Sequence, residues 1–559
     1  MPESATGQGY GDRAQLESGV NSQMARIGTR PLRVACVAAA VLGSILLLTG
    51  FTSHSAKVKT MIIAVPEVPA SVDPQLYQGN VSNNTYPTMA GPLFRFRPAP
   101  VDATTLQAPS AVEAFAAQSW KREASGSYVI TLRSDAKSEY GNTITPEDVK
   151  WTLLRVQALD FIGRYLMSLG NIDPKNPVTA IDAHSFRINV LAPSTLTLGV
   201  LTWSALAPVD SVEALKHATT TDPWARGWLT THSAWFGAYK VTGFQPSKTL
   251  FLTANPGFWK KPDISKVVVQ AVPDPSTRLQ AALAGQVDFT GELLPSQFKG
   301  AADNKNVQAI SLVSATMDNL MTSQLFKPFT DVRVRQAMTL AIDRDALVKS
   351  VYAGLAKSAL SPLSSAVATA TKPPVVTRDL AKAKSLMADA GFASGFDLTL
   401  TSCTCRLTGY GQQVAELLQA QLAQIGIRVK IDIVSASPEF QAGLTGKKYA
   451  AFLVDMTPAV VDPVYFYSTW VISNGLLSYY HSFKNPKFDA AIERAHYAPA
   501  GKAFNLFIAN AGKMAAADVP FIPLAEGRVN IIASKKLSGF RVYPHVGRLA
   551  IYVDTLTMS

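Results

Sequence analysis

Residues 396–434 hold the pattern that constrains the fold most strongly. Residues 396–401 and 427–434 each have the length and composition of a strand. Between them, residues 412–425 have the pattern of a helix, and Gly426 stands where helices commonly end. A strand–helix–strand unit of this length predicts two parallel strands with a right-handed crossover. The fold class is therefore expected to be α/β, with at least one parallel or mixed sheet.

The same alternation of strands and helices runs along most of the chain. Thr145, Asp274, Asp331 and Asp343 each stand where an N-cap is expected before a helix. We find no low-complexity linker and no repeat, and 559 residues are enough for two to four domains. Further strands are predicted at residues 60–65, 128–132, 250–254, 266–271, 287–289 and 449–454.

The N-terminal segment predicts export. Residues 1–33 are polar and rich in Gly, Ser and Gln, which predicts disorder. Residues 34–51 are apolar and uncharged, with Arg33 just before them and small residues at 53–56. This is typical of a signal peptide, although the run is also long enough for an uncleaved membrane anchor. In both cases the chain after Ala56 is expected outside the cytoplasm.

Charge and histidine content argue against several classes of function. The net charge is +12, but there is no Lys/Arg-rich run, so we expect no nucleic-acid partner. Seven histidines without a paired motif predict no metal site, and we expect no cofactor. Cys403 and Cys405 are the cysteines beyond the apolar run, and their redox state stays open. Gly-x-Ser-x-Gly, His-Glu-x-x-His and phosphate-loop motifs are absent, so catalysis is not expected.

Asp455 is the main candidate for a binding residue. It ends the apolar run 449–454, and Asp462-Pro463 follows shortly after. A carboxylate at the end of a buried strand is how α/β folds place a charge at the floor of a cleft. The alternative is an aspartate that caps a turn by accepting backbone N–H groups.

A series of short motifs resembles one family over nearly the whole exported chain. The family is the extracytoplasmic solute-binding proteins of ABC importers, in particular the peptide/nickel-binding group of dipeptide- and oligopeptide-binding proteins. Each motif is weak by itself, but their order and spacing match. The motifs lie at residues 73–74, 132–133, 144–149, 255–259, 281–288, 329–337, 341–344, 390–392, 424–427, 485–489 and 519–520.

The resemblance implies a periplasmic-binding-protein-like fold of two α/β lobes joined by a two-strand hinge. The hinge is expected near residues 322–326 and near Pro523. Lobe I would then comprise residues 57–324 and 523–559, with an extra subdomain at about 96–227. Lobe II would comprise residues 325–522.

The resemblance also implies roles for individual residues. Asp455 would hold the α-ammonium of a peptide, although Phe452 and Met456 stand where the family pattern has Trp and Tyr. Arg406 would hold the ligand carboxylate, with a solvated loop charge as the alternative. The main chain of Ala451, Phe452 and Leu453 would pair with the peptide and face Asn80, Val81 and Ser82. Trp470 and Asn474 would line side-chain pockets, or belong to the core.

The implied function is capture of short peptides between two closing lobes and delivery to the transmembrane subunits of an ABC permease. Alternatives within the fold are a nickel complex, haem or an oligosaccharide as ligand. A further alternative is an exported regulatory protein that has lost transport. The expected location is the periplasm or cell surface, with a membrane partner if the N-terminal segment is not cleaved.

Overall fold

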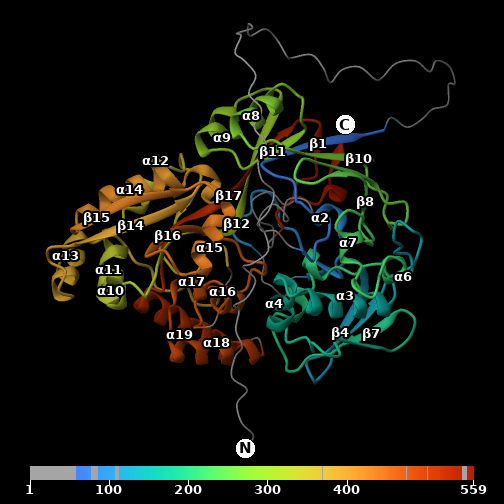
Figure 1. Cartoon of the computed structure of the whole chain (residues 1–559), viewed down its shortest axis with the longest axis horizontal. Helices are drawn as coiled ribbons and strands as arrows, with labels where there is room; N and C mark the ends of the chain where they lie inside the picture. Colours follow the sequence, from blue (N-terminus) through green and yellow to red (C-terminus); the bar gives the residue numbers. More distant parts are fainter. Residues whose placement is uncertain are drawn as a thin grey trace, which may run out of the picture. The chain divides into compact units, whose positions relative to one another are not determined.

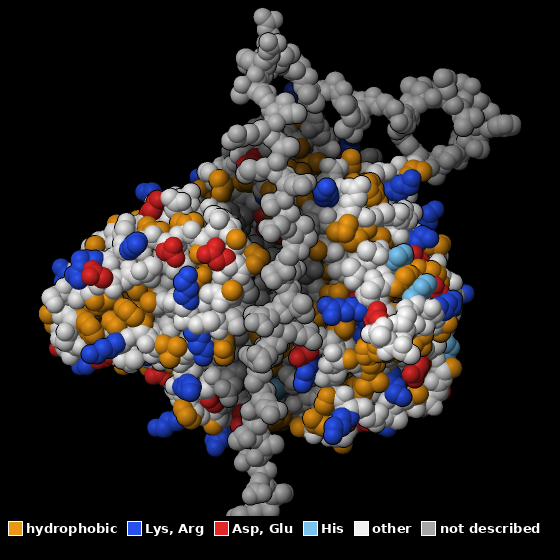
Figure 2. Space-filling model, in the orientation of Figure 1, with side chains coloured by type: hydrophobic (Ala, Val, Ile, Leu, Met, Phe, Trp, Pro, Cys, Tyr) orange, Lys and Arg blue, Asp and Glu red, His pale blue; other side chains and the backbone are white. Residues whose placement is uncertain are grey.

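The computed structural model describes residues 58–76, 86–106, 112–367, 369–473, 475–499, 501–543 and 551–559 (Figure 1). The predicted N-terminal disorder, the signal or anchor, and Asn80, Val81, Ser82 and Asn474 lie outside these residues. In the described ranges, no helix combines the length and apolarity needed to cross a membrane. On the face shown in Figure 2, basic and acidic side chains are interspersed rather than gathered into one patch.

One mixed sheet of eleven strands organises the described residues from position 58 onward. Two long antiparallel strands, β12 and β17, stand at its centre, and we call them the crossing strands. The order is β15 (Ile427–Val434), β14 (Phe396–Cys403), β16 (Ala451–Met456), β12 (Val307–Thr322), β17 (Phe521–Ser534), β11 (Phe289–Gly291), β1 (Thr60–Val65), β10 (Lys266–Ala271), β9 (Thr249–Ala254) and β8 (Tyr239–Gln245), while β13 (Lys357–Ser358) pairs with β17.

The crossing strands join two groups of strands. We call β11, β1, β10, β9 and β8 the first half of the sheet, and β16, β14 and β15 the second half. β12 pairs with β16 only from Met317 onward, and its register with β17 shifts between Val313 and Met317. The pairing therefore changes several residues before the hinge region 322–326 that the resemblance implied.

Helices cover both faces of the second half. Because side chains alternate along a strand, Ala451 and Leu453 pack in one core and Phe452 and Met456 in another. The first core is covered by α11 (Val332–Ala341), α12 (Arg344–Ser350), α13 (Leu380–Asp389) and α14 (Gly411–Ala423). The second is covered by α15 (Ser437–Thr445), α16 (Pro463–Trp470), α18 (Pro486–Tyr497) and α19 (Lys502–Asp518), with α17 (Ser478–His481) beside α15.

A separate four-stranded sheet lies within the range predicted for the extra subdomain. Its helix α3 (Pro146–Leu159) begins as the sequence predicts, because Thr145 and Asp148 form a reciprocal capping box. The strands are β4 (Ala117–Arg122), β5 (Tyr128–Leu132), β7 (Ser185–Ile188) and β6 (Val178–Ala180). The remaining elements are α2 (Tyr86–Met89), β2 (Phe94–Phe96), β3 (Val112–Ala114), α4 (Ile162–Leu169), α5 (Thr197–Val200), α6 (Ser211–Lys216), α7 (Arg226–Leu229), α8 (Pro275–Leu283), α9 (Pro295–Ala301), α10 (Lys327–Thr330), β18 (Leu537–Ser538) and β19 (Thr557–Met558).

A buried ion pair connects the C-terminal segment to β2. Arg95 donates to both carboxylate oxygens of Asp554, at 2.8 and 3.1 Å. The guanidinium lies between the rings of Phe115 and Tyr552, 3.5 and 3.9 Å from their centroids. The two charged side chains are only 4% and 7% exposed, so each depends on the other for compensation.

Candidate ligand-binding site

The carboxyl ends of three parallel strands define one edge of the second half. β14 runs parallel to β15 and to β16, so all three strands end on the same side of the sheet. Helix α14 begins near this edge, shortly after β14. In open α/β sheets this edge, next to a helix N-terminus, is where ligands generally bind.

Asp455 lies at this edge directly opposite a second carboxylate. In the register of β16 with β12, the cross-strand partner of Asp455 is Asp318. Side chains that are opposite in an antiparallel pair lie on one face, with Cβ atoms about 4.5–5.5 Å apart. Asp318 is 1% exposed and Asp455 is 7% exposed. We call these two residues the acid pair; like charges in such positions repel each other.

Hydrogen-bond donors from the second half stabilise the acid pair. The hydroxyls of Tyr352 and Tyr410 donate to Oδ2 of Asp318 at 2.9 and 2.8 Å. The N–H of Leu407 makes a longer contact, 3.4 Å, to Oδ1 of Asp455. Tyr410 is also the N-cap of α14, so the positive end of that helix dipole lies beside the acid pair.

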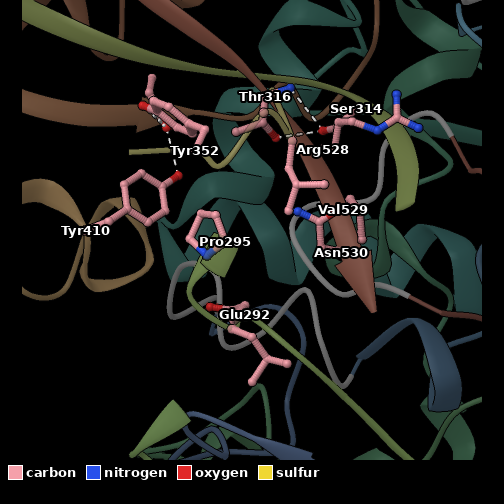
Figure 3. Close-up of a pocket in the computed structure, with 13 residues that line it drawn as sticks. Glu292, Pro295, Ser314, Thr316, Tyr352, Tyr410, Arg528, Val529 and Asn530 are labelled. Carbon is pink, nitrogen blue, oxygen red and sulfur yellow. Dashed lines mark hydrogen bonds between the residues drawn. The ribbon is translucent and has the colours of Figure 1, made fainter. Parts of the chain in front are cut away.

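A pocket adjoins the acid pair where the two halves of the sheet meet (Figure 3). Asp318 contributes to its lining, whereas Asp455, its partner on the neighbouring strand, does not. The lining residues are Glu292, Leu293, Pro295, Ser314, Thr316, Asp318, Tyr352, Leu355, Tyr410, Gly527, Arg528, Val529 and Asn530. We call this space the central pocket.

Arg528 gives the central pocket a positive wall. Its Nε donates to Ser311 Oγ and its Nη2 to the Ser311 carbonyl, both at 2.7 Å. The Ser311 hydroxyl in turn donates to Asn530 at 2.7 Å. Burial lowers the pKa of Arg528 from its ordinary value. Figure 3 shows Arg528 on the side of the pocket away from Tyr352 and Tyr410.

The strand pairing bears on the expected role of the main chain before Asp455. Ala451 pairs with Thr322 on one side and Leu400 on the other, and Phe452 is likewise paired on both sides. A peptide cannot add as a strand at these two residues because both of their edges are occupied. Leu453 pairs with Leu320 of β12 and its side chain is buried. Strand β16 also extends to Met456, two residues beyond the predicted end, so Asp455 belongs to the strand.

Two other predicted site residues lie away from the central pocket. Arg406 is half-buried in the loop after β14 and is not part of the pocket lining. Trp470 is 1% exposed and packs against Phe466, with ring centroids 3.7 Å apart. Its ring is therefore part of the core around α16, which is one of the two alternatives that the sequence left open.

Sequence reasoning missed Asp318, Tyr352, Tyr410 and Arg528. A signal was present for Asp318, because it is the one charged residue within the strand 307–322. Its proximity to Asp455 depends on pairing between strands more than 130 residues apart, which no local pattern reveals. Nor does the sequence settle that Cys403 and Cys405 form a disulfide, which the structure shows with an S–S distance of 2.02 Å.

Among the residues that the structure describes, no group of three or more His, Cys, Asp or Glu side chains could hold a metal ion.

Solved structures with a similar fold are two-lobed periplasmic binding proteins. The dipeptide binding protein of Pseudoalteromonas sp. SM9913, in complex with Met-Leu, matches with a TM-score of 0.76 at 19% identity, over 90% of this chain and all of that one. The protein DppA of Helicobacter pylori, in complex with the peptide STSA, has a TM-score of 0.73 at 20% identity and covers 89% of this chain and 98% of that one.

The sequence comparisons define the family. Residues 111–477 match the model of the bacterial extracellular solute-binding proteins, family 5. The glutathione-binding protein GsiB of Salmonella paratyphi A is 25% identical over 442 residues, covering 75% of this chain and 81% of that protein. The chain belongs to the bacterial extracellular solute-binding proteins, family 5, whose members are the binding components of ABC importers. The resemblance found in the sequence motifs is confirmed.

Proposed function

We propose that this protein captures short peptides with a free amino end and delivers them to an ABC permease. The observation that carries this proposal is the acid pair at the edge of the central pocket. An ammonium group has three donors and one positive charge, and it would relieve the repulsion between Asp318 and Asp455. The protein acts in this role by binding and release, without catalysis.

Two further observations support a peptide over other solutes. The relatives found by sequence are named for binding glutathione, and two structural neighbours are named for dipeptide and murein tripeptide binding. Other structural neighbours are in complex with a nickel–histidine complex, agropinic acid or mannopinic acid. The central pocket also presents both charges, with Asp318 and Glu292 among its acids and Arg528 as its base. A zwitterion needs a counter-charge for each of its ends when it leaves water.

The proposal places the folded part outside the cytoplasm, in the periplasm or at the cell surface. Residues 34–56 would act as a signal peptide or as a membrane anchor. The peptide-binding part would then meet the transmembrane subunits of its permease on that side.

Substituting Asp455→Asn tests the proposed ammonium site, because it keeps the shape and removes the charge. Losing one partner of a desolvated charge pair typically costs about 2–5 kcal/mol, or roughly a thirtyfold to several-thousandfold loss of affinity. Calorimetric titration with trialanine and N-acetyl-trialanine measures the effect. Acetylation should weaken binding strongly in the wild type and much less in Asp455→Asn.

A matched control is Asp303→Asn, which removes an exposed loop carboxylate. This variant should keep the full acetylation effect. If wild type and Asp455→Asn bind both peptides equally well, the ammonium site is not at Asp455 and the peptide proposal loses its main support.

A further inference from the structure

Arg528 is a fixed cation without a carboxylate partner among the described residues. No Asp or Glu in those ranges lies within 4.0 Å of its guanidinium. Its two protein acceptors, the hydroxyl and the carbonyl of Ser311, are both neutral. Arg278, which contacts the carbonyl of Glu292 beside the central pocket, has its Nη1 and Nη2 groups occupied by three backbone carbonyls.

The contacts of Arg528 orient the guanidinium without neutralising it. Ser311 binds Nε and Nη2, so the N–H groups of Nη1 have no acceptor in the described residues. A half-buried charge of this kind is costly until an anion meets it. A guanidinium suits a carboxylate because its planar fork offers parallel N–H groups to two oxygens.

The strand register gives the spacing between Arg528 and the acid pair. Along β17, Ala525 is opposite Asp318 and Arg528 is opposite Val313. Three residues of an antiparallel strand correspond to about 10 Å between the backbone positions. Both Asp318 and Arg528 contribute to the lining of the central pocket. An extended peptide of two or three residues spans about 7–10 Å, so its two ends fit this separation.

We propose that Arg528 binds the carboxylate end of the ligand, which makes the ligand a zwitterionic di- or tripeptide held at both ends. This inference rests on the proposed function, because the acid pair takes the amino end. It assigns to a crossing strand the role that the family resemblance suggested for Arg406. Arg406 follows the Cys403–Cys405 disulfide and contributes nothing to the lining of the central pocket.

The test pairs a change in the protein with a change in the peptide. Trialanine, its C-terminal amide and its N-acetyl derivative are titrated calorimetrically into wild type, Arg528→Gln, Arg528→Lys and Arg406→Gln. Amidation should weaken wild-type binding by at least about tenfold, the scale of a charge-assisted hydrogen bond. In Arg528→Gln the acid and the amide should bind with affinities within about threefold of each other. The variant lacks the positive charge that would favour the carboxylate over the amide. Arg406→Gln, the matched control, should keep the full amidation effect.

Peptide length provides an independent readout on unaltered protein. Pentaalanine, which places its charged ends too far apart for both sites, should bind at least about tenfold more weakly than trialanine. If Arg528→Gln fails to fold, Arg528→Lys and the wild-type length series still decide the question. Arg528→Lys keeps the charge but not the fork, so its amidation effect should be intermediate.

Two results would overturn the inference: an undiminished amidation effect in Arg528→Gln, or loss of that effect in Arg406→Gln instead. Equal binding of trialanine and pentaalanine would also contradict it. The N-acetyl arm separates this inference from the proposed function. Acetylation could weaken binding while the effect of amidation on affinity is the same in wild type and in Arg528→Gln. In that case the amino-end site stands and only the assignment of Arg528 fails.

Discussion

At the scale of single residues, repulsion within the acid pair lowers the stability of the β12–β16 strand pair. A cationic ligand would offset this repulsion. Asp318 and Asp455 face each other across two strands and are both nearly buried. Directly opposed like charges destabilise a strand pair by roughly 0.2–1 kcal/mol. Binding sites commonly retain such costs because the residues that recognise a ligand are seldom optimal for stability.

Asp318→Asn should lower affinity more than it changes stability. It removes one of two charges that attract the ligand ammonium, so affinity for trialanine should fall at least about tenfold. It removes the repulsion but also weakens the hydrogen bonds from Tyr352 and Tyr410, so the unfolding temperature should not fall in proportion to the affinity. Calorimetric titration and thermal unfolding of the same preparation measure both quantities. A variant with unchanged affinity and lowered stability would show that Asp318 serves the fold alone.

His481 should make the protein sensitive to acid. Its ring is fully buried, its Nε2 lies 3.2 Å from the carbonyl of Trp470, and burial lowers its pKa to about 4. In the unfolded chain a histidine has a pKa of about 6.5, so between pH 6.5 and 4 only the unfolded state takes up the proton. Stability is therefore lost as pH falls through this window, by about 2 kcal/mol between pH 7 and pH 5.

Urea unfolding of wild type and His481→Gln at these two pH values checks this expectation. The variant should lose about 2 kcal/mol less on acidification than the wild type. Asp462 acts in the opposite direction in both proteins, because burial raises its pKa to about 6. The exposed His232 provides the control as His232→Gln. Equal acid sensitivity of wild type and His481→Gln would contradict the assignment.

At the scale of elements, the sequence predicted local features well and pairings poorly. The caps at Thr145, Asp274 and Asp331 are found where they were predicted, because capping depends on residues two or three positions apart. The strand predicted at 449–454 is instead β16, Ala451–Met456. Its true limits follow from the pairing of Met456 with Met317 in β12, a contact that composition cannot specify.

The same reasoning explains what was found of the candidate site. Asp455 was identified because a carboxylate after an apolar run is a local signal. Asp318 and Arg528 lie on the crossing strands, and their relation to Asp455 arises only when those strands pair. The core and the pocket both stayed open for Trp470, because a helical aromatic residue is equally common in a core and in a pocket lining.

The ion pair between β2 and the C-terminal segment should contribute strongly to stability. Asp554→Asn would leave Arg95 buried without a counter-charge, which typically costs about 3–5 kcal/mol. The exposed pair Arg428–Asp397, with side chains 59% and 83% exposed, offers a matched comparison. Asp397→Asn should cost less than about 1 kcal/mol. Urea unfolding of both variants measures the difference, and equal effects would contradict the role of burial.

At the scale of the whole molecule, the crossing strands unite the fold and the candidate site. β12 and β17 pair with each other and connect the two halves of the sheet. They also supply Asp318 and Arg528, which are opposite charges in the lining of the central pocket. A ligand that contacts both residues would bind where the two halves of the sheet join. Ligand binding there could change how the two halves are held together.

The central claim is that the protein selects short peptides with free ends, and ligand selection from a mixture tests it most directly. The purified protein is unfolded to release bound solutes, refolded, and incubated with a protein digest mixed with a bacterial small-molecule extract. The retained molecules are then identified by mass spectrometry. We predict di- and tripeptides with unmodified amino and carboxyl ends, depleted when Asp455→Asn is used. Retention of a metal chelate, a sugar or another non-peptide solute, with no peptide retained, would contradict the account.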